Sequence, residues 1–169
     1  LDMSKIESGR MLLIENAFDL YHLLDSVEQM FQLQAIQKSL TLKVECSSEV
    51  PQYVRSDERK LRQILINLIG NALKFTRRGS IIVRAGMANG SLLMGKGQEN
   101  SNYPLPITHY QLQFEIEDTG CGIPVEEIED LFEPFVQSKT NRGFQEGTGL
   151  GLPISRAFAR LMGGDLTLV

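Results

Sequence analysis

An aspartate follows a predicted strand and precedes a glycine-rich turn in HYQLQFEIEDTGCGIP. Alternation from Leu112 to Ile116 gives this strand an apolar face, and Asp118 falls on the same face. A carboxylate turned toward the core is costly unless a donor satisfies it. Gly120 and Gly122 leave room beside it for a flat ligand, such as a purine ring that carries an amino group. Asp118 is therefore a candidate ligand-binding residue, and an aspartate that only caps the turn is the alternative.

A polar stripe lies on a predicted helix in LRQILINLIGNALKFT. Asn67 and Asn71 are four residues apart, and Lys74 extends the same helix face by one turn. Amide oxygens can ligate Mg²⁺ while the ion keeps waters and bridges phosphates, and a lysine is a suitable point charge for a phosphate. Asparagines are poor helix formers, which favours a binding role. The alternative is an ordinary amphipathic helix with a solvated polar side.

A run of glycines at positions 147, 149 and 151 precedes an apolar segment in EGTGLGLPIS. The spacing matches neither the dinucleotide fingerprint nor the Walker loop. By itself the run indicates either a phosphate-binding device or a mobile loop before a helix.

The spacing of apolar residues predicts the elements that position these residues. Helical periodicity predicts one helix from Asp19 to about Lys38. It predicts a second helix that begins at a cap, Ser56 or Asp57, and runs to about Phe75. Another helix has Pro153 in its first turn. Strands are predicted in LTLKVEC, SIIVRAG and HYQLQFEIED, and DLTLV would begin a further one, whereas VPQYVRSD is expected to be a loop. The pattern predicts an α+β fold, a two-layer α/β sandwich with its helices mostly on one face of the sheet.

Two segments are expected to lie outside this framework. LDMSKIESG has the form of a helix end stopped by Gly9, which suggests a stretch cut from something longer. Residues 86–107 are rich in Gly, Asn and Ser and are expected to form a flexible insertion.

The composition limits the class of protein. The chain has 169 residues, about one domain, with 42% hydrophobic and 22% charged residues, as in soluble globular proteins. A net charge of −4 argues against nucleic acid as the main partner. Cys46 and Cys121 are far apart and lack metal-type spacing, so we expect two small core residues in a reduced, cytosolic setting.

Each motif is weak alone, but the order N-x-x-x-N-x-x-K, D-x-G-x-G, F-x-x-F, G-T-G-L-G-L is specific. In this order the sequence resembles the ATP-binding catalytic domain of bacterial sensor histidine kinases, hybrid kinases included. INLIGNALKFT resembles that family's N box, DTGCGIP its first glycine box, FEPFVQ its phenylalanine box and GTGLGLPIS its second glycine box. The likeness covers nearly the whole chain.

The resemblance implies the Bergerat ATP-binding fold, with a mixed sheet and helices on one face. Residues 1–10 would be the tail of the preceding dimerisation and phosphoacceptor helix. Residues 11–169 would be the ATP-binding domain, truncated before its last strand. Asp118 would accept a hydrogen bond from the adenine amino group, and Asn71 would ligate Mg²⁺ that bridges the triphosphate. Asn67 would help to place the phosphates, and Lys74 would neutralise them.

The resemblance also assigns residues 136–147 to a lid over ATP. The glycines of the second box would let the lid backbone hinge and approach the phosphates, with helix amides facing the anion. Lys139 and Arg142 would contact the γ-phosphate, or else be solvated loop charges. Phe132 and Phe135 would anchor the lid, and packing explains both. The remaining implied nucleotide-binding residues are Gly120, Gly122, Ile123, Gly147, Thr148, Gly149, Leu150, Gly151 and Leu152.

Position 67 bears on the type of reaction. In the related ATPases a glutamate one turn before the magnesium ligand activates water, and Asn67 cannot act as a general base. The resemblance therefore implies a protein-histidine kinase module of two-component signalling and phosphorelay, with ATP and Mg²⁺ as cofactors. A hydrolytic ATPase of the same fold, and a binding module that has lost transfer, are the alternatives.

A phosphoacceptor box is missing from the sequence. The surroundings of His22 and His109 do not resemble one, so we expect the chain to bind ATP without phosphorylating itself. The implied partners are the dimerisation domain of the same protein and a response-regulator receiver domain. The parent is expected to be a homodimer in the cytoplasm, whether or not it is tethered to a membrane, and this chain a monomer.

Overall fold

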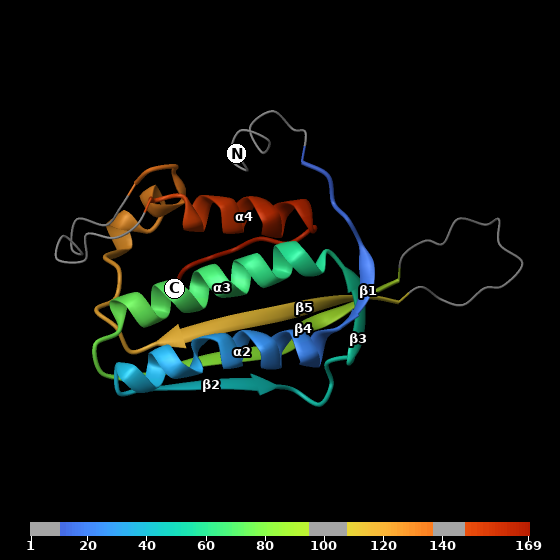
Figure 1. The fold of residues 1–169 in the computed structure, drawn as a ribbon. Coiled ribbons are helices and arrows are strands. Elements are labelled where there is room, and N and C mark those ends of the chain that lie inside the picture. The colour runs from blue at the N-terminus through green and yellow to red at the C-terminus, as the bar shows by residue number, and fades with distance from the viewer. Residues whose placement is uncertain (1–10, 95–107, 137–147) are drawn as a thin grey trace, which may run out of the picture.

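The computed structural model describes residues 11–94, 108–136 and 148–169, and these form two layers (Figure 1). A sheet makes one layer, and helices α2 and α3 cover one of its faces. Helix α4 packs on α3 rather than on the sheet. This arrangement confirms the predicted α+β sandwich with its helices on one face. The predicted boundary between residues 1–10 and 11–169 stays a prediction, because the first segment lies outside the described residues.

The main sheet has the order β2-β4-β5. Strand β2 (Leu40–Cys46) runs parallel to β4 (Gly79–Met94), and β4 is antiparallel to β5 (Thr108–Asp118). The sheet is therefore mixed, as predicted. In its register Ile81 lies opposite Asp118, so the candidate aspartate ends the sheet beside the start of β4.

Strand β4 is longer than the sequence suggested. It continues past Gly86 to Met94 because it pairs with the start of β5 through a register shift between Met87 and Leu92. The insertion expected over residues 86–107 therefore starts at residue 95 at the earliest, and 95–107 is outside the part of the chain that the structure describes.

The helices are α2 (Leu20–Gln37), α3 (Glu58–Phe75) and α4 (Gly151–Leu161). Asp19 caps α2 by accepting from the backbone N–H of His22, and Asp57 caps α3 by accepting from that of Lys60. The predicted starts of α2 and α3 are thus correct, because a short polar side chain at each start satisfies a helix N–H that has no backbone partner. None of the described helices is long and apolar enough to cross a bilayer.

The remaining elements are short. Strand β1 (Asn16–Asp19) pairs with β3 (Tyr53–Ser56) in a two-stranded antiparallel ribbon, so the loop expected in VPQYVRSD contains a strand. Two 3₁₀ turns, η1 (Val125–Glu127) and η2 (Asp130–Phe132), follow β5. The strand expected in DLTLV is not formed, and residues 164–169 have no regular structure.

The core fills the space between the helices and the inner face of the sheet. The inner residues of β5 that alternation predicted, Leu112, Phe114 and Ile116, are half-buried against it. Cys46 and Cys121 are both exposed, so the expectation that they are core residues was wrong. Cys46 ends β2 and Cys121 lies in the turn after β5, beyond the packed interior. Among the described residues, the largest fully buried aliphatic side chains are those of Leu20, Leu23, Val27, Leu65, Ile69, Leu73, Ile81 and Val83.

Candidate functional site

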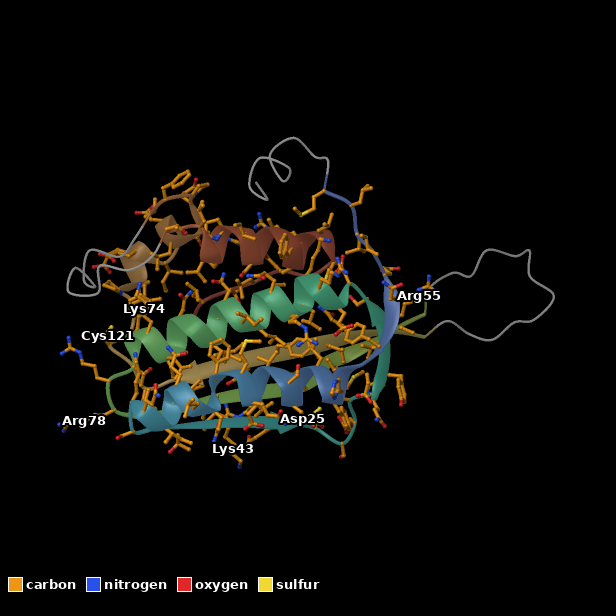
Figure 2. All side chains as sticks on the ribbon, in the orientation of Figure 1. Asp25, Lys43, Arg55, Lys74, Arg78 and Cys121 are labelled. Carbon is orange, nitrogen blue, oxygen red and sulfur yellow. The ribbon has the colours of Figure 1, made fainter. Side chains whose placement is uncertain are left out.

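The end of α3 meets the end of β5, which brings two of the sequence motifs together. The hydroxyl of Thr76, just after α3, donates to Asp118 Oδ1 at 3.4 Å. A β-carbon on Gly120 would lie 2.9 Å from the carbonyl oxygen of Phe75. Figure 2 shows Lys74 and Cys121 at this same end of the molecule. The end of α3 and the turn after β5, which are more than 40 positions apart in the sequence, therefore lie side by side.

Asp118 lies where the inner face of β5 leaves the core, and its side chain is exposed. Alternation along β5 predicts that Asp118 faces the core, but β5 ends at this residue, so the carboxylate reaches solvent at a lower cost of burial. The backbone N–H of Gly120 donates to Asp118 Oδ1 at 2.7 Å. Both hydrogen bonds described for this carboxylate use Oδ1, and Oδ2 can accept from a ligand. The turn-capping and ligand-binding interpretations are therefore compatible.

The turn after Asp118 keeps the space beside the carboxylate clear. A β-carbon on Gly120 would lie 2.6 Å from Asp118 Oδ1, closer than real contacts allow. Gly122 has φ +70°, a backbone conformation that favours glycine. Ile123 follows with an exposed side chain. The predicted nucleotide residues of this turn thus border one open surface.

The polar stripe of α3 faces another helix. Asn67, Asn71 and Lys74 are all half-buried, so this side of α3 is only partly exposed to solvent. Asn67 Nδ2 donates to Ser155 Oγ on α4 at 2.8 Å. Lys74 Nζ lies 5.0 Å from the centroid of the Phe75 ring. None of the described residues makes a side-chain hydrogen bond with Asn71, which is half-buried.

The second glycine box is held against both the phenylalanine box and α3. The backbone N–H of Phe135 donates to the carbonyl of Gly149, which has φ +67°. A β-carbon on Gly149 would lie 2.8 Å from Val136 O, and one on Gly151 would lie 2.6 Å from Asn67 Oδ1. Glycine at these positions therefore allows close approach of backbone to neighbouring groups.

The first turn of α4 differs from those of α2 and α3. Its N-cap residue, Leu150, makes no side-chain cap hydrogen bond, and Pro153 has no N–H to offer. The N–H groups of Gly151 and Leu152 have no partner within the helix, because the first residues of any helix lack one. Such a helix start favours an anion. Thr148 lies exposed just before it.

Three of the predicted site residues, Lys139, Arg142 and Gly147, fall in the segment 137–147 that the structure leaves undescribed. Their contacts stay predictions, as does the lid over residues 136–147. Phe132 is half-buried, and the Arg156 guanidinium lies 4.3 Å from its ring centroid. Phe135 is 73% exposed, so packing does not explain it.

The donor set fits a magnesium ion that arrives with a phosphorylated ligand. Among the described residues, no group of three His, Cys, Asp or Glu side chains could hold a metal ion. Mg²⁺ typically takes one or two protein ligands and completes its shell with waters and substrate phosphates. Asn71 lies one turn beyond Asn67 on α3 and has an amide oxygen, so its chemistry suits that role.

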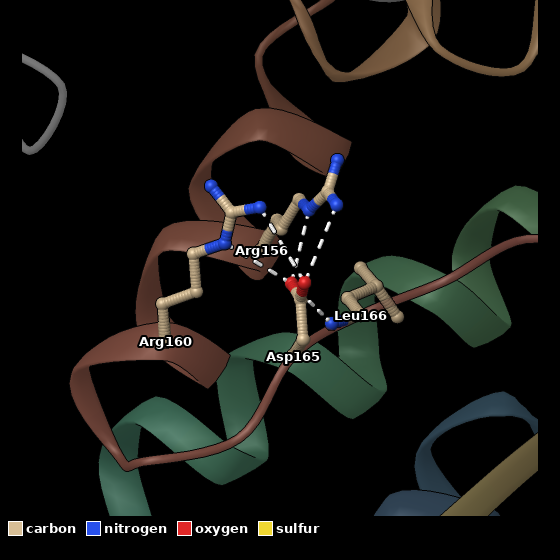
Figure 3. Close-up of polar contacts among 4 residues, drawn as sticks. All are labelled: Arg156, Arg160, Asp165 and Leu166. Carbon is tan, nitrogen blue, oxygen red and sulfur yellow. Dashed lines mark hydrogen bonds and ion pairs between the residues drawn. The ribbon is translucent and has the colours of Figure 1, made fainter.

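An ion-pair cluster on α4 was not predicted from the sequence. Arg156 and Arg160 both donate to Asp165 Oδ1, through Nε at 2.9 and 3.2 Å, as Figure 3 shows. These guanidinium groups and the N–H of Leu166 lower the pKa of Asp165 well below its ordinary value, with Arg156 as the largest cause. The cluster ties the segment after α4 back onto the helix.

A hollow of about 470 Å³ lies beside this cluster. Its lining includes Phe132, Pro153, Arg156 and Leu161, and none of the predicted nucleotide-binding residues. Because Gly151 and Ser155 contact α3, the hollow lies on the opposite face of α4. It is therefore separate from the candidate site.

The comparisons with known proteins agree on one family. Residues 56–169 match the family model described as "Histidine kinase-, DNA gyrase B-, and HSP90-like ATPase". Hybrid signal transduction histidine kinase B of Dictyostelium discoideum is 36% identical over 168 residues, which are 98% of this chain and 8% of that protein. The aerobic respiration control sensor protein ArcB of Escherichia coli is 36% identical over 170 residues, 99% of this chain and 19% of ArcB.

A solved structure shows the same fold. The crystal structure of full-length ShkA in complex with AMPPNP superposes with a TM-score of 0.75 at 28% identity, over 96% of this chain and 29% of that one. The predicted fold class is confirmed by this likeness. The chain is a small part of the length of each of these proteins.

Proposed function

The chain belongs to the histidine kinase-, DNA gyrase B-, and HSP90-like ATPase family, and from this membership we propose that it binds Mg·ATP and donates the γ-phosphoryl group to a histidine. The acceptor would lie on a separate dimerisation domain, in two-component signalling. The names of the relatives support this proposal, because they are histidine kinases and sensor proteins.

One observation carries the proposal. The polar stripe of α3 runs from Asn67, which contacts the uncapped start of α4, toward Thr76, which contacts Asp118. A carboxylate acceptor thus lies at one end of the stripe, and at the other lies the start of α4, whose N-cap residue makes no side-chain cap hydrogen bond. An adenine nucleotide has a matching polarity, with an amino group on its base and negative charge on its phosphates.

Each residue then has a role that its chemistry allows. Asp118 Oδ2 accepts from the adenine amino group, while Oδ1 stays bound to Gly120 and Thr76. Asn71 supplies an amide oxygen to Mg²⁺, which when bound neutralises phosphate charge. Lys74 adds a positive charge, and the amides of Gly151 and Leu152 donate to phosphate oxygens. Positioning and charge neutralisation dominate phosphoryl transfer, so no acid or base on this chain is required.

The side chain at position 67 favours transfer over hydrolysis. Its amide donates to Ser155 and has no basic atom with which to activate water. We therefore propose that the chain binds ATP without steady hydrolysis or self-phosphorylation. The proposed partners are the dimerisation domain of the same protein and a receiver domain, the parent being a cytoplasmic homodimer and this chain a monomer.

Calorimetric titration with Mg·AMPPNP tests the nucleotide site. Asp118→Asn replaces an acceptor by an amide that can also donate, and we expect affinity to fall at least about tenfold. A guanine nucleotide, with a carbonyl where adenine has its amine, should bind the original chain more weakly than the adenine one. Unchanged affinity of Asp118→Asn would remove the adenine assignment.

Glu117→Gln is the matched control, because Glu117 is the neighbouring carboxylate on the opposite face of β5. It pairs with Arg84 at 2.7 Å, away from the site, and its loss should leave binding unchanged. Transfer is tested by adding a dimerisation domain from a histidine kinase with [γ-³²P]ATP. Label on its histidine supports the kinase, whereas steady phosphate release by this chain alone would favour a hydrolytic ATPase.

A further inference from the structure

The described residues contain three buried polar side chains: Asp57, Thr76 and Ser155. Asp57 caps α3, which accounts for it. The other two are hydroxyls that are 1% exposed, and each contacts one candidate ligand residue. Thr76 contacts Asp118, and Ser155 contacts Asn67. The hydroxyls therefore lie directly behind the two ends of the proposed nucleotide site.

Ser155 is an unfavourable choice for helix stability alone. Serine is a poorer helix former than alanine, and burying a hydroxyl is costly unless it is hydrogen-bonded. Alanine would fit the space without either cost. The gain from serine lies in its contact with Asn67, whose Nδ2 donates to Ser155 Oγ at 2.8 Å.

This hydrogen bond fixes the orientation of the Asn67 side-chain amide. With Nδ2 directed at Ser155, the amide lies against Gly151, where a β-carbon would be 2.6 Å from Oδ1 and 2.7 Å from Nδ2. The first turn of α4, with its uncapped N–H groups, is thereby held against the stripe of α3 that carries Asn71. A free Asn67 side chain could rotate and release this contact.

We infer that Ser155 is a positioning residue for the phosphate end of the site. It acts through Asn67, by holding that amide and the first turn of α4 in the arrangement that receives the triphosphate and its metal. This inference rests on the proposed function, since it assigns the phosphates to this end.

The test compares two ligands on the 169-residue chain. Ser155→Ala should bind Mg·AMPPNP about fivefold more weakly, the loss expected for one hydrogen bond, and bind adenosine as the original chain does. Thr76→Val is the matched control at the other end, because it removes the hydroxyl behind Asp118. It should weaken adenosine and Mg·AMPPNP by the same factor.

A double-mutant cycle shows whether Ser155 acts through Asn67. Adding Ser155→Ala to Asn67→Ala should cause no further loss of Mg·AMPPNP affinity. Equal losses for adenosine and Mg·AMPPNP, additive effects in the cycle, or unchanged binding by Ser155→Ala would each overturn the inference. If Ser155→Ala does not fold, Ser155→Cys carries the same test, since a thiol is only a weak acceptor.

These measurements also distinguish failure of the Ser155 inference from failure of the proposed function. Loss of Mg·AMPPNP binding in Asp118→Asn together with unchanged binding in Ser155→Ala would keep the nucleotide site and reject the role of Ser155. No binding of Mg·AMPPNP by the original chain would reject both.

Discussion

In the first half of α3 three of the four charged side chains, those of Glu58, Lys60 and Arg62, form ion pairs, whereas in the second half Asn71 has no side-chain hydrogen bond to the described residues. Lys60 Nζ lies 2.6 Å from the carboxylate of Asp57, and Arg62 lies 2.8 Å from Glu58. The second half carries no such ion pair among the described residues, and its Asn71 has no side-chain hydrogen bond to them. One helix thus separates stabilising contacts from contacts available to a ligand.

This difference gives a way to tell structural polar residues from functional ones. A paired polar side chain that is removed leaves its partner unsatisfied, so the folded state loses stability. An open polar side chain in a helix gives the fold little, and replacing it with alanine can even stabilise the helix. Mutations of the ion-paired side chains in the first half should therefore alter stability, and mutation of Asn71 in the second half should alter binding.

The largest effect that we expect is a loss of stability on mutation of Asp57, at the start of α3. Asp57 is 2% exposed and accepts from Lys60 Nζ, from the Lys60 N–H and from the N–H of Ile14. Asp57→Ala leaves a largely buried ammonium group and two amides without this acceptor, so we expect the free energy of unfolding to fall by about 3 kcal/mol. Urea unfolding followed by circular dichroism measures it.

Asp19→Ala is the comparison variant, since Asp19 caps α2 in the same way but pairs with no buried cation. Asp19→Ala should lower the free energy of unfolding by less than Asp57→Ala does. Nucleotide affinity of folded Asp57→Ala, measured at low temperature, should match that of the original chain. A large loss of affinity without loss of stability would contradict the division of α3 into two halves.

Features that depend on residues close together in the sequence could be predicted from it. The caps Asp19 and Asp57 and the turn after Asp118 depend on residues within three positions of each other, so their types and spacing predict them. Strands β2 and β5 follow from alternation, because one face of each packs on the core.

Features that depend on distant pairing escaped prediction. Strand β3 contains an arginine and a serine and follows a proline, and it is a strand because it pairs with β1. The hydrogen bond of Asn67 to Ser155 joins residues 88 positions apart, so no local spacing reveals it. The exposure of Asp118 depends on where the sheet leaves the core, which alternation alone does not show.

The next largest effect is expected in the second half of α3. Asn71→Ala removes the proposed magnesium ligand, so affinity for Mg·AMPPNP should fall at least about tenfold, or about 1.4 kcal/mol. Adenosine, which carries no phosphate, should bind as before. Stability of the unliganded chain should rise by roughly 0.5 kcal/mol, because alanine is the better helix former.

Gln63→Ala controls for helix propensity and amide loss. Gln63 is exposed and precedes Asn67 by one turn on the same face. Its replacement should leave binding unchanged in calorimetry. If Asn71→Ala destabilised the chain, Asn71 would be a structural residue like those of the first half, and the comparison would fail.

The smallest effect concerns pH, and it belongs to the first half only. Burial alone would raise the pKa of Asp57, but hydrogen bonds from Lys60 and Ile14 outweigh it, so the pKa is lower than in the unfolded chain. A carboxyl group with a lowered folded-state pKa releases its proton more readily when folded. Its contribution to stability is therefore complete above its ordinary pKa of about 3.9 and is lost as pH falls through the folded-state value.

Asp57→Asn tests this sign, because the amide keeps one acceptor oxygen but has no charge to titrate. The difference in unfolding free energy between the original chain and Asp57→Asn should be constant from about pH 8 to pH 5 and should shrink below about pH 4. Asn71→Ala carries no titrating group at the mutated position, so its stability difference should not change with pH. A difference at Asp57 that persists unchanged into acid would mean that shape, and not charge, accounts for the stabilising role of the first half of α3.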